Sequence, residues 1–105
     1  MTYYVYVIEL DKEVLNIRRF RKRNPHATNE SRCFYVGQSR YEPDVRFEQH
    51  KNGHKANRYV REYGMYLRRR KYKKYNPIAT REQALKTEEM LANKLVREGH
   101  AVWWG

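Results

Sequence analysis

The sequence has a single cysteine, three prolines and no long apolar run, and each shortage narrows what the chain can be. Cys33 has no partner for an internal disulfide and no companion cysteine for a structural zinc site. No apolar stretch approaches the roughly 20 residues that a membrane-spanning helix requires. Stability must therefore come from an apolar core, and 105 residues are enough for one domain but not for two.

A secretory signal is not evident in the first thirty residues. The segment from Met1 to Leu10 alternates polar and apolar residues, and the charged stretch follows it instead of preceding it. We therefore expect a cytoplasmic protein, associated with the nucleoid if its source is bacterial.

Negative charge is also scarce. Lysine and arginine number 23 against 12 aspartates and glutamates, which leaves a formal net charge of +11. On so small a domain this excess creates a positive potential that favours polyanions, so nucleic acid is the expected partner. In a ribosomal or membrane-surface protein, a similar excess of positive charge serves only for attachment. Composition does not distinguish these classes from a nucleic-acid enzyme.

Two strands are expected early in the chain. Residues 3–10 and 32–37 are β-branched and aromatic, and the second segment ends at Gly37. Between them, at about 11–31, lies a basic insertion with apolar residues spaced as in a short helix. The pattern predicts that the two strands are neighbours in a sheet.

The middle of the chain predicts two helices and a third strand. One helix starts at Glu42-Pro43-Asp44 and runs to about His50. A second covers 54–63, presents its cations on one face, and stops at Gly64 in a left-handed cap. Residues 65–67 read as a strand, and six of the seven residues from 68 to 74 are basic.

The clearest helix opens at Thr80, whose hydroxyl can cap it in a capping-box pattern with Gln83. Apolar residues then recur at helical spacing until Gly99. Residues 101–104 follow as a short extended tail with enough aromatic surface to dock against the body.

Three polar residues occupy positions that suggest chemistry. Arg46 and His50 are four residues apart, so a helix places both on one side, where they can converge on one ligand. Glu88 falls within the apolar stripe of the last helix, and a carboxylate on a packing face needs a partner.

In this order of elements the chain resembles the GIY-YIG nuclease superfamily over most of its length. The first motif reads Tyr4-Val5-Tyr6 and the second Tyr35-Val36-Gly37. The arginine that follows the second motif corresponds to Arg46, in the arrangement Arg-x-x-x-His. The segment Gln-Ala-Leu-Lys-Thr-Glu-Glu-Met-Leu matches the helix that bears the metal-binding glutamate, which assigns that role to Glu88.

The resemblance implies an α+β fold, a three-stranded antiparallel sheet flanked by helices, and hydrolysis of phosphodiester bonds in DNA more than in RNA. Glu88 would hold one Mg²⁺ or Mn²⁺, and Arg46 would bind phosphate through its planar donor fork. Tyr6 and Tyr35 would line the pocket, Tyr6 being favoured to position or deprotonate water. His50 would take that proton or bind phosphate. Gly37 would permit close backbone packing or an unusual dihedral beside the site.

Further cations are expected to contact the nucleic-acid backbone. These are Lys55, Arg58, Arg61, Arg68, Arg69, Arg70, Lys71, Lys73 and Lys74.

Three features differ from the family pattern. Tyr4 replaces the glycine of the first motif, the spacer at 11–31 is long, and no asparagine follows the last helix. A non-catalytic nucleic-acid-binding module on the same scaffold is therefore the alternative to a nuclease. Sequence specificity would come from a protein partner, a homodimer or the shape of the nucleic acid.

Overall fold

Two strands rich in aromatic and β-branched residues form the centre of the sheet in the computed structural model, which describes residues 1–105. β1 (Tyr4–Leu10) and β2 (Cys33–Ser39) pair antiparallel along their whole length. Six of the seven residues of β1 and five of those of β2 are buried. Both faces of these strands are covered, which explains why their apolar residues run continuously. The two predicted strands and their pairing are confirmed.

The sheet has four strands in the order β3-β1-β2-β4, so the expected α+β class is confirmed but the expected three-stranded antiparallel sheet is wrong. The predicted third strand is present as β3 (Gly64–Leu67) and pairs antiparallel with β1. β4 (Ala101–Trp104), expected to be a docked tail, pairs parallel with β2. The preceding helix carries the chain back across the sheet, so β4 enters beside β2 in the same direction.

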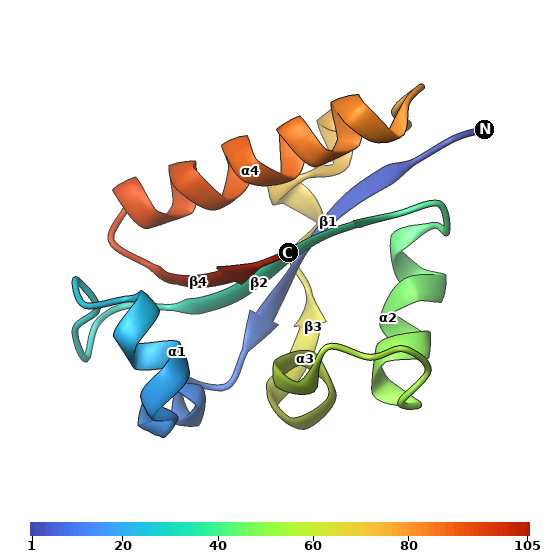
Figure 1. The fold of residues 1–105 in the computed structure, drawn as a ribbon. Helices are drawn as coiled ribbons and strands as arrows, with labels where there is room; N and C mark the ends of the chain where they lie inside the picture. The colour runs from blue at the N-terminus through green and yellow to red at the C-terminus, as the bar shows by residue number, and fades with distance from the viewer.

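Helices cover both faces of the sheet (Figure 1). α4 (Arg81–Arg97) lies on one face and packs on β4, β2 and β1. α1 (Arg18–Arg23), α2 (Pro43–Lys51) and α3 (Arg58–Tyr63) lie on the other. The Thr80 hydroxyl caps α4 by accepting from the Gln83 amide at 3.1 Å, and Gly99 follows its end with φ +94°. None of these helices has the length and apolar character needed to cross a membrane.

The basic insertion is built into the core. It forms the 3₁₀ helix η1 (Lys12–Asn16) and then α1, and it buries Val14 and Phe20 completely. Phe20 stacks on Trp103 with ring centroids 6.1 Å apart. The buried Asn24 side chain accepts from the Val102 amide at 2.8 Å and donates to the Val102 carbonyl at 3.1 Å. This segment therefore holds the outer edge of β4 and is more than a surface loop.

α3 differs from the predicted helix at both ends. It begins at Arg58, with the Asn57 side chain as its cap, so residues 54–57 are not helical. Gly64 has φ −64° and ψ 128°, which is extended and not left-handed. A Cβ atom there would lie 2.4 Å from the Val60 carbonyl oxygen, so close approach of the backbone requires the glycine. The Lys51 ammonium donates to carbonyls at this end of α3 instead.

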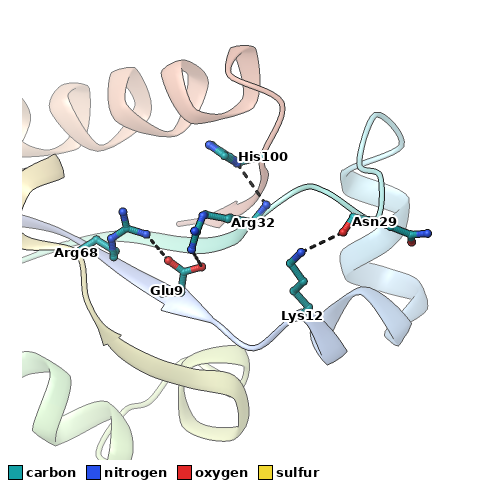
Figure 2. Close-up of polar contacts among 6 residues, drawn as sticks. All are labelled: Glu9, Lys12, Asn29, Arg32, Arg68 and His100. Atoms are coloured by element: carbon teal, nitrogen blue, oxygen red, sulfur yellow. Dashed lines mark hydrogen bonds and ion pairs between the residues drawn. The ribbon is translucent and has the colours of Figure 1, made fainter.

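A buried carboxylate ties the segment after β3 to the central strands (Figure 2). Glu9 on β1 is 4% exposed and lies between the guanidinium groups of Arg68 and Arg32. Arg32 also donates its backbone N–H to Nδ1 of His100 at 3.3 Å. The pairs compensate the desolvation of Glu9, because a buried charge without a partner is strongly unfavourable. Beyond Arg68 the chain continues as the 3₁₀ helices η2 (Arg69–Lys71) and η3 (Lys73–Tyr75).

Asn24→Ala should destabilise the protein by about 2–4 kcal/mol, because it leaves the buried Val102 amide and carbonyl without partners. The measurement is urea unfolding at neutral pH, with Asn29→Ala in the exposed part of the same segment as the matched control. Equal stability of the two variants would contradict the role assigned to Asn24.

Candidate active site

The first candidate catalytic residue, Tyr6, depends on the missing side chain of Gly37. The two residues are direct partners across β1 and β2. A Cβ atom built on Gly37 would lie 2.5 Å from the Tyr6 hydroxyl oxygen and 2.6 Å from its Cζ atom. The phenol ring therefore occupies the space above the glycine, so of the two expected reasons for Gly37 the structure supports close packing, by a side-chain ring, and not an unusual dihedral.

His50 of α2 meets this phenol. Its Nε2 atom lies 2.9 Å from the Tyr6 hydroxyl, and each residue is only 1% exposed. Its Nδ1 atom accepts the backbone N–H of Asn57 at 3.1 Å. A neutral imidazole that accepts through Nδ1 carries its proton on Nε2, so His50 donates and the Tyr6 oxygen accepts. The proton of Tyr6 remains free for another acceptor.

Tyr35 completes an aromatic cluster with these two residues. Its ring centroid lies 6.2 Å from that of Tyr6 and 5.7 Å from that of His50. Burial raises the pKa of Tyr35 to about 12 and raises the pKa of Tyr6 well above its ordinary value. The positive charge of Arg46 lowers both pKa values but does not outweigh burial. Both tyrosines are therefore neutral phenols in the resting protein.

Arg46 lies one helical turn before His50 on α2. Its guanidinium donates to the Gln49 side chain at 3.3 Å and to the carbonyls of His54 and Lys55 at 3.1 and 2.8 Å. These bonds leave two of the five guanidinium N–H groups for other acceptors. Burial, reinforced by the charge of Arg46, lowers the pKa of His50 to about 4, so the imidazole is neutral near pH 7.

A cationic cavity of about 260 Å³ opens beside Arg46. No acidic residue lines it; the lining consists of Ser39, Arg40, Tyr41, Arg46, Gln49, His54 and Lys55. An anion such as a phosphate group fits this lining by charge. Arg40 was not among the predicted site residues. Its position directly after β2, near the second motif, could have indicated it.

Glu88 comes from α4, on the face of the sheet opposite α2 (Figure 1). It is 6% exposed and has no ion pair with any cation. Burial raises its pKa to about 7, an effect that the Gly105 backbone N–H opposes. Its negative charge raises the pKa of Tyr35 and of Tyr6, so the carboxylate lies within electrostatic reach of the tyrosines.

A divalent ion would suit this unpaired carboxylate. No group of three His, Cys, Asp or Glu side chains is arranged to hold a metal. Glu88 would therefore be the single protein ligand, and Mg²⁺ in proteins is commonly held by one or two carboxylates together with water and substrate phosphate. The residues present thus fit such an ion.

The cations predicted on α3 do not share one helical face. Lys55 has φ +42° and lies in the turn before α3, where it lines the cavity beside Arg46. Arg58 and Arg61 are exposed on α3, and Arg58 pairs with Glu62 at 3.5 Å. The prediction of a common face is wrong because the helix starts at Arg58.

The basic run from 68 to 74 divides between two surfaces. Arg69 and Lys73 line a cavity of about 300 Å³ at the start of α2, where Arg69 pairs with Asp44 at 2.5 Å. The hydroxyl of Tyr72, which also lines this cavity, is buried without a hydrogen-bond partner. The other cations of the run, Arg68, Arg70, Lys71 and Lys74, line a separate groove against α4.

Comparison with known proteins finds no family model, curated protein or solved structure that matches this chain. The geometry is then the evidence on which a function is proposed. It brings Tyr6, Tyr35 and His50 into contact, places Arg46 and Glu88 within electrostatic reach of the tyrosines, and puts Gly37 beneath Tyr6.

Gly37→Ala should destabilise the protein by about 1–3 kcal/mol, because the new methyl group collides with the Tyr6 ring. In a Tyr6→Leu background the same substitution should cost less, since the two nearest colliding atoms belong to Tyr6 and only the Tyr35 Cε2 atom at 2.9 Å remains too close. Chemical unfolding of the two single variants and the double variant measures this coupling, with Gln38→Ala as the control. Strictly additive costs would rule out the contact.

Glu88→Gln should stabilise the metal-free protein at pH 8 but not at pH 4. The raised pKa means that between pH 4.5 and about 7 the unfolded chain releases the Glu88 proton while the folded chain keeps it. Wild-type stability therefore falls across this window relative to the glutamine variant, by about 1–3 kcal/mol after allowance for solvent screening. Unfolding in a chelator at both pH values measures the difference, and Glu89→Gln on the exposed face is the control. A difference independent of pH would refute the shift.

Proposed function

We propose that this chain is a metal-dependent endonuclease of the GIY-YIG type that hydrolyses phosphodiester bonds, with DNA as the preferred substrate. The observation that carries the proposal is the contact between the Tyr6 hydroxyl and His50 at 2.9 Å, made above a glycine that leaves room for it. The two residues are 44 positions apart, and the motif pattern pairs them independently of the structure.

The phosphate is the first group that the site must hold. Arg46 lines the cationic cavity and has two N–H donors beyond those bonded to Gln49, His54 and Lys55, with Tyr6 within hydrogen-bonding reach, and Arg40 and Lys55 add positive charge without a competing carboxylate. Charge-assisted hydrogen bonds from a guanidinium are strong and suit phosphate oxygens. Arg46 would also stabilise the negative charge that develops on those oxygens during attack.

The attacking water is the second group. Because His50 donates to the Tyr6 oxygen, the Tyr6 O–H group is left to donate to a water or a phosphate oxygen. The raised pKa of Tyr6 favours a positioning role for the neutral phenol over a resting phenolate base. The Tyr35 ring, which comes from β2, lies beside the Tyr6 ring and would narrow the space for this water.

Glu88 is the residue that would hold Mg²⁺ or Mn²⁺. When bound, such an ion supplies positive charge that neutralises the phosphate and the leaving oxygen and makes bound water more acidic. The carboxylate must be ionised to bind it, and its pKa of about 7 allows this from neutral pH upward.

The fold is compatible with the family that the motifs suggest. β3, β1 and β2 form a contiguous antiparallel unit, which fits the three-stranded sheet implied by the resemblance. In this proposal β4 is an addition at the edge of β2. We place the activity in the cytoplasm, with specificity supplied by a protein partner or a homodimer.

A non-catalytic nucleic-acid-binding module is the alternative. Tyr6 and His50 are each 1% exposed, so substrate reaches their polar atoms only if neighbouring side chains move. No asparagine follows α4 in the positions where many members of the superfamily have one. Both features favour binding without cleavage.

Cleavage of labelled branched, double-stranded and single-stranded DNA and RNA at low salt tests the proposal. With Mg²⁺ or Mn²⁺, wild type should cut at least one substrate, and chelation should abolish cutting. Glu88→Gln should lower the rate on the order of 100-fold or more with binding retained, because charge neutralisation in the transition state is lost.

Glu89→Gln, the exposed neighbour on α4, is the matched control and should cut within about twofold of wild type, because the charge that it loses is screened by solvent. Tight binding by all variants without cutting on any substrate would establish the binding module instead.

A further inference from the structure

A groove of about 290 Å³ lies between the 3₁₀ segment after β3 and the C-terminal half of α4. It belongs to the α4 side of the sheet, whereas the Tyr6–His50 contact lies on the α2 side (Figure 1). Its lining consists of Arg68, Arg70, Lys71, Lys74, Leu91, Lys94, Leu95 and Glu98. The groove is thus distinct from the candidate active site.

The charge in this groove is not balanced internally. Arg68 is committed to the buried Glu9 carboxylate, as Figure 2 shows. The other four cations of the lining form no ion pair within the protein, and Glu98 is the only acidic side chain among them. Four cations against one carboxylate leave an excess of three positive charges in one concave surface.

The framework that carries these cations is fixed. The Arg68 backbone N–H donates to the Val7 carbonyl at 2.8 Å, and the Lys71 ammonium lies over the Phe34 ring at 5.3 Å. Lys71 ends η2 and Lys74 lies in η3, and both line the groove. Lys94 faces them from α4. Cations held on rigid elements lose less entropy when they bind an anion.

We propose that this groove binds the sugar-phosphate backbone of the nucleic acid at nucleotides away from those in the candidate active site. The inference rests on the proposed nucleic-acid partner but not on catalysis. Four unpaired cations with a net excess of three positive charges in one groove match the regular negative charge of a phosphodiester chain. The groove lies beside α4, which also carries Glu88, while the Tyr6–His50 contact lies on the α2 side, so a substrate that engages both must extend from one side of the sheet to the other.

Binding of labelled duplex and branched DNA, measured by fluorescence anisotropy over a range of salt concentrations, tests the groove. The groove variant is Lys71→Gln/Lys74→Gln/Lys94→Gln. The matched control, Arg19→Gln/Arg21→Gln/Lys22→Gln, removes the same charge from the exposed side of α1. The groove variant should bind on the order of 10- to 100-fold more weakly near 0.1 M salt, and its log–log salt slope should fall by about 2.7.

The control should lose less than about threefold in affinity, because long-range charge alone is screened at this ionic strength. Equal losses in both variants would show that net charge alone drives binding and would overturn the groove. Unchanged affinity of the groove variant, or no binding of nucleic acid by wild type, would overturn it as well.

Catalysis gives a separate readout. If wild type cuts, the groove variant should need on the order of 10- to 100-fold more protein to reach half of its maximal single-turnover rate, because it binds the substrate more weakly. An unchanged half-maximal protein concentration would contradict the groove. If wild type binds without cutting, with the predicted loss in the groove variant, the nuclease proposal fails and the groove stands.

Discussion

The absence of a side chain at Gly37 is the constraint on which the candidate site depends. It lets the Tyr6 ring lie across β2 and bring its hydroxyl to His50, whose other nitrogen is held by the Asn57 N–H at the start of α3. Arg46 then fixes the intervening turn through the carbonyls of His54 and Lys55. A chain of contacts thus runs from one glycine in the sheet through Tyr6 and His50 to the start of α3.

Much of the fold could be predicted because its patterns are local. The side-chain types predict β1 and β2, and the helical periodicity of apolar residues predicts α4. The spacing of Thr80 and Gln83 predicts the helix cap. β4 was misread because four residues at an edge carry the same apolar character whether they pair or merely dock. Gly64 was misread because a close approach to Val60 and a left-handed turn both call for glycine, and only the backbone path distinguishes them.

The residues of the candidate site could be predicted from the sequence better than their protonation and hydrogen bonding. The helical spacing of Arg46 and His50 placed them on one side, and the motif pattern selected Tyr6 and Tyr35. The proton arrangement was not predictable, because it follows from the Asn57 N–H, which reaches His50 only through the fold of the turn. The distribution of the basic residues from Arg68 to Lys74 could not be predicted from composition either. Two short 3₁₀ helices place neighbouring cations on different surfaces.

Burial acts on the charges of the site in one direction. It lowers the pKa of His50 and raises the pKa of Glu88, and in both cases it favours the neutral form. Arg46 is thus the main fixed charge near the tyrosines at neutral pH. Under the proposed function, an incoming phosphate meets a positive surface, while Glu88, only partly ionised near pH 7, becomes fully ionised there when a cation compensates for burial. Phosphate and divalent ion are therefore expected to enter together, because each offsets the charge that the other brings.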